Sequence, residues 1–511
     1  MMPTSSSKFQ SSLSKSNETQ IILRSAIASR VLILTLIILW RSLFSPYDTS
    51  ATLNPNCLTS SNSNTTPKQN VLLPSIGSAI EGSIVWDGVY FIRIAQCGYE
   101  YEQTYAFLPL LPICLYVLSN TVFAPLIPII GYRAVLGLSG YVINNIAFVF
   151  AAVYFYRLSL IILKDPRAAL RASLLFCFNP ASIFYSSLYS ESLYSLFSIG
   201  GIYHLISGAN TIAVLQLALS GSARSNGVLN AGYFCFQTMH KAYDAIFQKR
   251  LTGLAVQSLV AGAVRILIIF IPFIAFQAYG YYNICLGRLF DEMSPWCKGR
   301  LPILYDYLQS HYWGVGFLRY FQFKQLPNFL LASPILFLAL LSIIHYAELR
   351  PEVVFSLGFR AAWEEKKDAA VLYSLQSARE SNGLQFSDDF SSKTPQGNST
   401  LKQRKKKTKE ENPDSARNPA PSDYEAKSGY SSILILPFVL HLVFMGATAF
   451  LVMHVQVATR FLSASPPLYW FSSYLMISPG NGRRWGYLIW TYSVAYILLG
   501  SLLFSNFYPF T

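Results

Sequence analysis

Two acidic residues stand out from an apolar sequence as candidates for acid–base chemistry. Asp87 follows Trp86 in the polar, aromatic-rich stretch 82–99, which lies between two strongly apolar segments. Glu191 lies among serine and tyrosine residues in the stretch 176–194. An ionisable side chain in or beside a membrane segment costs free energy, so such residues are functional candidates. Either carboxylate could remove a proton from a sugar hydroxyl at the bilayer surface.

Both acids also have a structural interpretation. Asp87 is followed by Gly-Val-Tyr-Phe-Ile and could cap the N-terminus of a helix. Glu191 could instead bond to the Ser and Tyr hydroxyls that hold membrane helices together. Asn179, directly before Pro180, interrupts the same apolar stretch, and interrupted membrane helices usually line a cavity. The residues alone leave open which acid is the base.

Two arginines suit the recognition of a phosphate. Arg224 follows a long apolar stretch and needs a partner, and Arg460 lies beside hydroxyl side chains just after an apolar segment. The guanidinium fork matches a phosphate, although an arginine at the end of a span is often only an interfacial anchor. His311 and Arg319 are further phosphate candidates. The other candidates for substrate binding are polar or aromatic side chains of the same clusters: Trp86, Tyr90, Arg93, Glu102, Asn179, Asn226, His454 and Gln456.

The sequence predicts no metal site and no nucleotide cofactor. Its six histidines are scattered, with no His-x-x-x-His spacing. It contains no Walker loop and no GxGxxG motif, so a soluble nucleotide is not the expected donor, and no nucleic-acid partner is expected. The seven cysteines form no Cys-x-x-Cys pair. If their loops are lumenal, Cys57 could pair with Cys97 and Cys285 with Cys297.

The composition is that of an all-α polytopic membrane protein. Of the 511 residues, 52% are hydrophobic and only 13% charged, against roughly 25% charged residues in soluble domains. The net charge of +14 suits anionic headgroups or a phosphate-bearing substrate. An excess of basic residues in cytosolic loops is the alternative explanation.

Hydropathy divides the chain into alternating membrane and polar parts. We expect about eight to eleven transmembrane or re-entrant helices, because several apolar stretches are shorter than the ~20 residues of a full span. A re-entrant piece is expected near 119–131. The predicted parts are a disordered cytosolic N-terminus (1–27), a first transmembrane helix (28–45), a lumenal loop with the Trp86-Asp87 motif (46–104), a membrane-embedded core (105–346), a disordered, charged cytosolic loop (347–430) and C-terminal transmembrane segments (431–511).

The clusters that hold these candidates resemble the PIG-V family of GPI mannosyltransferases. The matching stretches occur in family order between residues 86 and 467 and together are highly specific. They are Trp86-Asp-Gly-Val-Tyr-Phe-Ile-Arg-Ile-Ala, Gly98-Tyr-Glu-Tyr-Glu-Gln, Ala106-Phe-Leu-Pro-Leu-Leu-Pro, Phe178-Asn-Pro-Ala-Ser-Ile-Phe-Tyr-Ser-Ser, Tyr189-Ser-Glu-Ser-Leu-Tyr, Ala223-Arg-Ser-Asn-Gly, Pro327-Asn-Phe-Leu-Leu-Ala and His454-Val-Gln-Val-Ala-Thr-Arg-Phe.

The resemblance implies a GT-C glycosyltransferase fold in the endoplasmic reticulum membrane, with an active site that faces the lumen. It implies transfer of mannose from dolichyl-phosphate mannose to the first mannose of a GPI precursor, in α-1,6 linkage. Fungal members of the family work with a small membrane partner subunit. The rival interpretations are another dolichyl-phosphate-sugar transferase of N-glycan precursor assembly, or a lipid transporter or scramblase. The transporter is disfavoured because the sequence shows no inverted repeat.

The implied reaction needs one base, because a β-linked donor gives an α-linked product. A single displacement of this kind fits one prominent acid better than a pair of catalytic carboxylates. We expect Asp87 to accept the proton of the attacking hydroxyl, and Arg224 or Arg460 to stabilise the departing phosphate. Glu191 would bind acceptor hydroxyls or act as an alternate base. Trp86 would shape the sugar site together with Tyr90.

Overall fold

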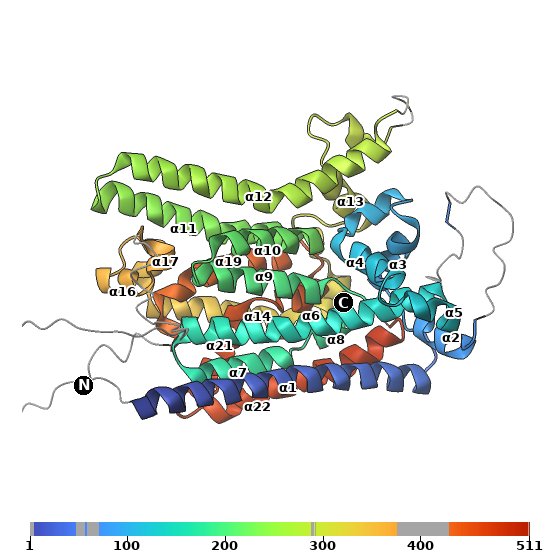
Figure 1. Cartoon of the computed structure of the whole chain (residues 1–511), viewed down its shortest axis with the longest axis horizontal. Helices are drawn as coiled ribbons and strands as arrows, with labels where there is room; N and C mark the ends of the chain where they lie inside the picture. The colour runs from blue at the N-terminus through green and yellow to red at the C-terminus, as the bar shows by residue number, and fades with distance from the viewer. Residues whose placement is uncertain are drawn as a thin grey trace, which may run out of the picture.

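The computed structural model confirms an all-α architecture with several membrane-length helices (Figure 1). It describes residues 5–47, 57–58, 71–287, 291, 293–375, 429–508 and 510. Every regular element in these ranges is a helix. Helix α9 packs between α6 and α10 at the centre, and the main core extends from there to α1, α7, α14, α19, α21 and α22.

Six helices of the described chain contain stretches long and apolar enough to cross a membrane. They are α1 (Ser5–Leu43), α6 (Tyr132–Leu163), α12 (Thr252–Ile284), α14 (Leu326–Leu349), α19 (Leu436–Leu451) and α22 (Gly482–Ser505). A further pair is bent by 68° and could form a seventh span or a re-entrant loop. It consists of α4 (Leu110–Asn120) followed by η2 (Ala124–Leu126) and α5 (Ile127–Ile130). This break lies where the sequence predicts a re-entrant piece.

The number of membrane-length helices is smaller than the expected eight to eleven, because several apolar stretches fold into short helices. These helices have 10 to 16 residues, below the ~20 of a full span. They are α7 (Pro166–Cys177), α9 (Glu191–Ile206), α10 (Asn210–Ala223), α11 (Ala231–Tyr243) and α21 (Pro466–Leu475). Their apolar residues pack largely against other helices of the protein.

The remaining described elements are short and mostly connect the longer helices. They are α2 (Pro74–Gly82), α3 (Asp87–Cys97), η1 (Glu102–Ala106), α8 (Ser182–Ser186), η3 (Ser225–Asn230), η4 (Asp244–Gln248), η6 (Pro295–Lys298), α13 (Leu304–Tyr312), η7 (Phe323–Gln325), α15 (Pro351–Phe355), α16 (Trp363–Asp368), α17 (Ala370–Tyr373), η9 (Gly429–Ser431), η10 (Ile433–Ile435), η11 (Val455–Val457) and α20 (Ala458–Leu462).

Two segments that the sequence predicts as disordered are partly helical. Helix α1 begins at Ser5, far ahead of the predicted start at residue 28, because the chain from there to Leu43 contains no Gly or Pro. In the charged loop, residues 351–373 contain the short helices α15, α16 and α17. The remainder of that prediction, over 376–428, lies outside the described residues.

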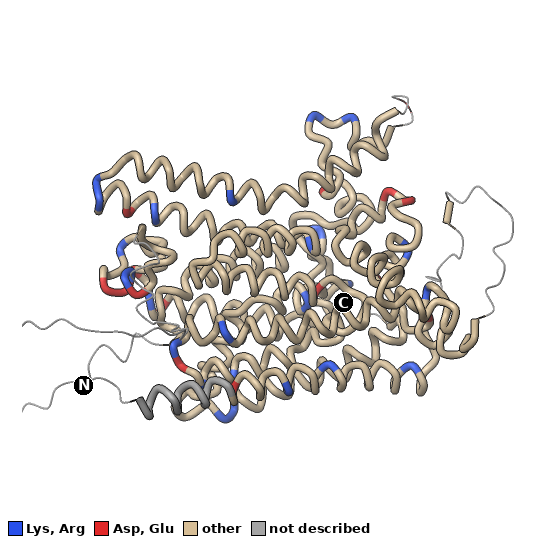
Figure 2. The backbone as a smooth tube through the Cα atoms, in the orientation of Figure 1, with Lys and Arg blue, Asp and Glu red and all other residues tan. Residues whose placement is uncertain are grey.

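Figure 1 places α3, α4 and α13 at one end of the helical body and α16 and α17 at the other. Both cysteine pairs expected from the sequence are disulfide bonds: Cys57 with Cys97, and Cys285 with Cys297. Cys97 ends α3, and the second bond closes the loop between α12 and α13. Figure 2 shows charged residues located mainly toward the two ends of the body. The disulfides therefore mark one end as the one suited to an oxidising compartment.

A buried arginine ties the first helix to the interrupted segment between α7 and α8. Arg30 of α1 is 3% exposed. Its Nη1 donates to the Ser182 carbonyl and to Ser186 Oγ, both at 3.0 Å, and its Nη2 donates to the Cys177 carbonyl at 3.4 Å. Its guanidinium carbon lies 3.8 Å from the ring centre of Phe148. Arg30 thus ties both sides of the helix break to α1.

We expect Arg30→Met to lower the free energy of unfolding by about 2–3 kcal/mol, because it removes a charged donor that bonds to three buried oxygen atoms. Thermal unfolding of the detergent-solubilised protein measures the loss. Arg24→Met is the matched control, since Arg24 is an exposed arginine of the same helix. Equal melting temperatures for the two variants would show that the buried contacts of Arg30 contribute nothing.

Candidate active site

The turn at Trp86 sets the position of the first acid. Trp86 has a φ of 53°, a left-handed conformation that costs about 1–3 kcal/mol outside glycine. Its indole Nε1 donates to the Phe504 carbonyl at 3.1 Å, and its ring centre lies 5.7 Å from that of Phe507. These contacts with the C-terminal part of the chain hold the strained residue in place. Trp86 therefore positions Asp87 and does not line the cavity described below.

Asp87 is the first residue of α3, where the positive end of the helix dipole stabilises a carboxylate. Trp86 occupies the N-cap position, and no side chain caps this helix, so the capping interpretation of Asp87 is wrong. The carboxylate Oδ2 instead accepts a hydrogen bond from Arg460 Nη1 at 3.0 Å. The backbone N–H of Asp87 donates to the Tyr189 hydroxyl at 3.2 Å. Asp87 therefore pairs with a distant part of the chain.

Glu191 is the first residue of α9, and its side chain is only 2% exposed. Its Oε1 accepts a short hydrogen bond from Arg224 Nη1 and lies 3.8 Å from Arg460 Nη1. Its Oε2 is buried and has no hydrogen-bond partner in the described part of the chain. Glu191 is thus held by two arginines through one oxygen, while the other oxygen is left for a ligand.

The two arginines reach these acids from different elements. Arg224 lies in extended backbone at the junction of α10 and η3, whereas Arg460 belongs to α20. Burial alone would lower the pKa of Arg460, but Asp87 and Glu191 raise it above its ordinary value. Arg460 therefore stays charged. Its guanidinium also lies 5.3 Å from the ring centre of Tyr189.

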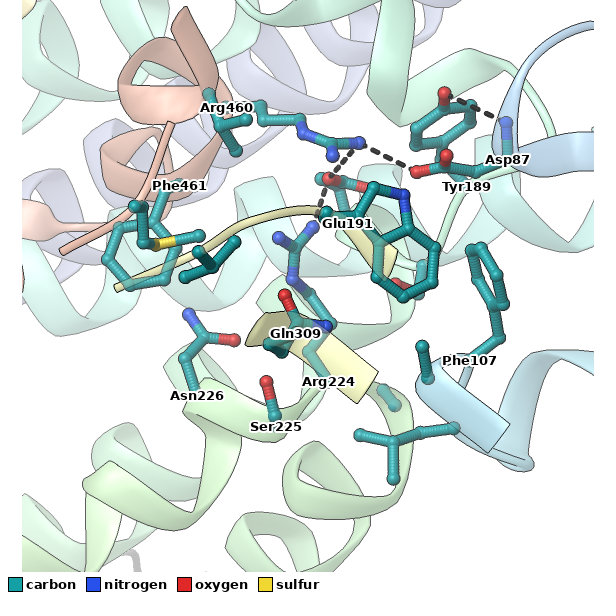
Figure 3. A pocket seen from close by; sticks show the side chains of 18 of the residues that line it. Asp87, Phe107, Tyr189, Glu191, Arg224, Ser225, Asn226, Gln309, Arg460 and Phe461 are labelled. Atoms are coloured by element: carbon teal, nitrogen blue, oxygen red, sulfur yellow. Dashed lines mark hydrogen bonds and ion pairs between the residues drawn. The ribbon is translucent and has the colours of Figure 1, made fainter. Parts of the chain in front are cut away.

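The four charged side chains meet in one cavity of about 200 Å³ (Figure 3). Residues from several separate parts of the chain line it: Asp87, Phe91, Ala106, Phe107, Leu108, Tyr189, Ser190, Glu191, Ala223, Arg224, Ser225, Asn226, Tyr305, Gln309, Trp313, Val315, Met453, His454, Val457, Arg460 and Phe461. Two buried donors in this lining, Arg460 Nε and Asn226 Nδ2, have no partner among the described residues. Buried polar groups normally have partners, so these donors indicate an anionic or polar ligand.

Six of the twelve candidates from the sequence line this cavity. They are Asp87, Glu191, Arg224, Asn226, His454 and Arg460. Three of the others lie just behind it. Trp86 supports the turn, Tyr90 stacks on the cavity residue Phe107 at 4.7 Å, and Gln456 Oε1 accepts a hydrogen bond from Tyr320 at 2.7 Å.

The structure gives Arg93, Glu102 and Asn179 partners away from the cavity. Arg93 forms a buried ion pair with Glu100 at 2.5 Å. Asn179 is fully buried, and its side chain accepts from the Ala181 N–H and donates to the Phe176 carbonyl, both at 2.9 Å. It thus stabilises the break after α7. The further phosphate candidates His311 and Arg319 do not line the cavity either.

Sequence reasoning missed several cavity residues that carry no charge. Tyr189 lies beside Asp87, and burial together with Asp87 raises the pKa of its hydroxyl well above the ordinary value, so it stays neutral. Tyr305, Gln309 and Trp313 come from α13 and the residue after it. The Tyr305 hydroxyl lies 2.7 Å from Ser225 Oγ. All four occur within aromatic clusters, but no sequence signal distinguishes them from neighbouring aromatic residues.

Glu102 holds the segment that carries α13. Its Oε1 accepts hydrogen bonds from Ser294 Oγ and Trp296 Nε1, both at 2.7 Å, and its Oε2 accepts from the Tyr312 hydroxyl at 2.9 Å. The carboxylate thereby joins η1 to the loop closed by the Cys285–Cys297 disulfide and to the end of α13.

We expect Glu102→Ala to raise the acceptor KM about tenfold and to change kcat much less. Loss of three charge-assisted bonds loosens α13, and tenfold corresponds to about 1.4 kcal/mol of binding free energy. Steady-state transfer kinetics measure both constants. A kcat loss as large as that of a cavity acid would instead place Glu102 in the chemistry.

One group of three potential metal ligands lies close together in the described residues: Cys57, Cys97 and Glu100. The two cysteines are bonded to each other, and Glu100 pairs with Arg93, so these atoms are already engaged. Asp87 and Glu191 likewise each pair with arginine.

The fold and the cavity define a polytopic membrane protein that brings two acids and two arginines together in one polar cavity. A family model described as Mannosyltransferase (PIG-V) matches residues 18–511. The chain therefore belongs to the PIG-V mannosyltransferase family, and the resemblance seen in its motifs is confirmed.

Named relatives agree with this assignment. The chain is 27% identical to the GPI alpha-1,6-mannosyltransferase 2 of Cricetulus griseus over 480 residues, which cover 89% of this chain and 83% of that protein. The human protein of the same name is 27% identical over 482 residues, with the same coverage. The GPI mannosyltransferase 2 of Drosophila pseudoobscura pseudoobscura is 30% identical over 476 residues, or 87% of this chain and 91% of that protein. No solved structure matches.

Proposed function

We propose that this chain transfers mannose from dolichyl-phosphate mannose to the first mannose of a GPI precursor, in α-1,6 linkage and with inversion. Membership of the PIG-V family and the names of its relatives support the acceptor and the linkage. The observation that carries the proposal is the cavity itself. It combines an accessible acid for a hydroxyl proton with two arginines and with two donors, Arg460 Nε and Asn226 Nδ2, that have no partner among the described residues.

Asp87 is the base in this proposal. Its side chain is 34% exposed, whereas that of Glu191 is 2% exposed and is held by two guanidinium groups. Arg460 engages only Oδ2, so Oδ1 of Asp87 is free among the described contacts to accept the hydroxyl proton. As the acceptor oxygen bonds to the mannose C1, the C1–O bond to phosphate breaks and the phosphate takes the electron pair.

Arg224 and Arg460 stabilise the negative charge that develops on the departing phosphate. Preorganised donors in a water-poor cavity are worth more than the same donors in water. Arg460 contributes its free Nε and Asn226 its free Nδ2. Arg460 and Asn226 both belong to the lining of the cavity (Figure 3).

Glu191 has two tasks in this arrangement. Its Oε1 holds Arg224 and Arg460 near each other, which keeps both guanidinium groups in place before the substrate arrives. Its free, buried Oε2 can accept a hydrogen bond from a sugar hydroxyl. Glu191 therefore orients substrate and cations, and the proton goes to Asp87.

The proposal places the cavity on the lumenal side of the endoplasmic reticulum. Both disulfides lie at the cavity end of the body, and disulfides persist in oxidising compartments. A small membrane subunit, implied by the resemblance to fungal members, is included as a partner. Activity assays are therefore run with membranes that contain it.

Lipid analysis of depleted cells tests the proposed acceptor. Loss of this protein should cause GPI intermediates to accumulate with one mannose, and its return should remove them. Accumulation of a truncated N-glycan precursor, with normal GPI intermediates, would instead support the rival dolichyl-phosphate-sugar transferase.

A further inference from the structure

An apolar groove of about 430 Å³ lies beside the candidate active site. Helices α11, α12 and α19 form its walls, and η3 forms one end. No Asp, Glu, Lys or Arg lines it. Its lining is instead aliphatic and aromatic, for example Leu229, Ile266, Phe270 and Leu440. The groove thus offers an environment for a hydrocarbon chain and not for a sugar.

The groove and the active-site cavity share the short helix η3. Arg224, Ser225 and Asn226, at its start, line the cavity. Val228 and Leu229, in its next turn, line the groove. A 3₁₀-helix rises about 2 Å per residue, so Asn226 and Leu229 are only about 6 Å apart along its axis. A molecule with a charged group at Arg224 can therefore continue directly into an apolar channel.

The groove extends away from the cavity along α11 and then closes. Helix α11 begins at Ala231, directly after η3, and its groove-lining residues reach Phe236. Two residues further on, α11 and α12 are in close contact. Gly262 of α12 lies so near Thr238 of α11 that a Cβ added to this glycine would be only 2.1 Å from the Thr238 Oγ1 atom. On the opposite wall, α19 contributes residues 437–444, about 10 Å of helix. The groove is therefore bounded by the cavity end and this helix contact.

We propose that this groove holds the polyisoprenoid chain of the lipid-linked mannose donor, an inference that rests on the proposed function. In such a donor, the mannose, the phosphate and the lipid chain follow one another directly. With the mannose near Asp87 and the phosphate near Arg224, the chain starts at η3, where the apolar lining begins. The reacting mannose of the acceptor is separated from its own lipid by the rest of the glycan, so it places no chain at this point.

Gly232 offers a way to fill the groove without disturbing the fold. It lines the groove on α11, and a Cβ added there would meet nothing within 4 Å. Gly253, near the start of α12, has the same open surroundings and does not line the groove. Gly232→Trp and Gly253→Trp are therefore matched variants, and Gly232→Leu provides a smaller filling that also raises helix propensity.

The test compares kcat/KM for a long-chain dolichyl-phosphate mannose and for a mannosyl phosphate with a single short prenyl group. We expect wild type and Gly253→Trp to prefer the long chain by about tenfold or more, since each buried methylene contributes to binding. We expect Gly232→Trp to reduce this preference to within about twofold, with Gly232→Leu between them. A general loss of activity lowers kcat/KM for both donors by the same factor, so it does not change the ratio of the two values.

The groove assignment is overturned if Gly232→Trp and Gly232→Leu keep the wild-type preference for the long-chain donor. It is also overturned if the wild-type enzyme shows no preference for chain length. In both cases mannose transfer itself persists, so the proposed function stands. Absence of transfer from either donor by wild type would instead overturn the proposed function and the groove with it. If the groove instead holds the acyl chain of an ordinary phospholipid, Gly232→Trp and Gly253→Trp should show the same preference for the long-chain donor. That result would also overturn the assignment.

Discussion

Replacing Asp87 by Asn is expected to lower mannose transfer about a thousandfold while the protein remains folded and expressed. The amide keeps the size of the side chain and can still accept a bond from Arg460, but it cannot take the hydroxyl proton. Rescue of cells that lack the enzyme, together with transfer assays on membranes, measures the effect. The helix start at residue 87 carries no cap from this side chain, so the substitution removes no capping bond.

Asp306→Asn is the matched control for Asp87→Asn. Asp306 is an exposed aspartate in the first turn of α13, beside the cavity residue Tyr305, and it does not line the cavity. We expect this variant to transfer mannose at the wild-type rate. Full rescue by Asp87→Asn would remove Asp87 from the role of base and move that role to Glu191.

The second large effect is expected for Arg460→Lys, which should lower kcat about a hundredfold. Arg460 contacts Asp87 Oδ2 and Glu191 Oε1 with one nitrogen and presents its Nε as a free donor. A lysine keeps the positive charge but loses the planar fork that grips a phosphate. Single-turnover transfer from dolichyl-phosphate mannose separates this loss of kcat from an effect on binding.

Arg319→Lys controls for the general effect of replacing an arginine in this region. Arg319 is exposed and lies outside the cavity, so its replacement should leave kcat unchanged. If Arg460→Lys is also indistinguishable from wild type, the guanidinium of Arg460 does not hold the phosphate through its fork.

The fold was predictable where helices are long and lie between polar segments. Hydropathy identifies α6, α12, α14, α19 and α22 for this reason. It does not separate a lipid-facing helix from a short helix buried inside the protein, because both are apolar. Helix α9, with 16 residues packed between α6 and α10, is of the second kind. The Ser-rich N-terminus shows the opposite error, since composition suggested disorder where α1 is already helical.

The site was predictable to the extent that charges are rare in this sequence. Asp87, Glu191, Arg224 and Arg460 stood out for that reason, and the structure brings all four together. Glu102 stood out equally, but its partners Ser294 and Trp296 come from a loop almost two hundred residues away, which no local pattern reveals.

Uncharged cavity residues could not be selected from the sequence. Tyr189 is one of 33 tyrosines, and nothing in its neighbourhood distinguishes it from tyrosines that only pack. Its place beside Asp87 follows from the break before α9 and from the turn at Trp86. Positions of this kind depend on tertiary geometry and therefore required the structure.

The most direct measurement is transfer of radiolabelled mannose from dolichyl-phosphate mannose to a one-mannose GPI precursor, with membranes that contain this chain and the proposed partner subunit. We expect one labelled mannose to be added in α-1,6 linkage by wild type, and almost none by Asp87→Asn. Membranes in which the labelled donor is intact and wild type still adds no mannose to this precursor would contradict the proposed function.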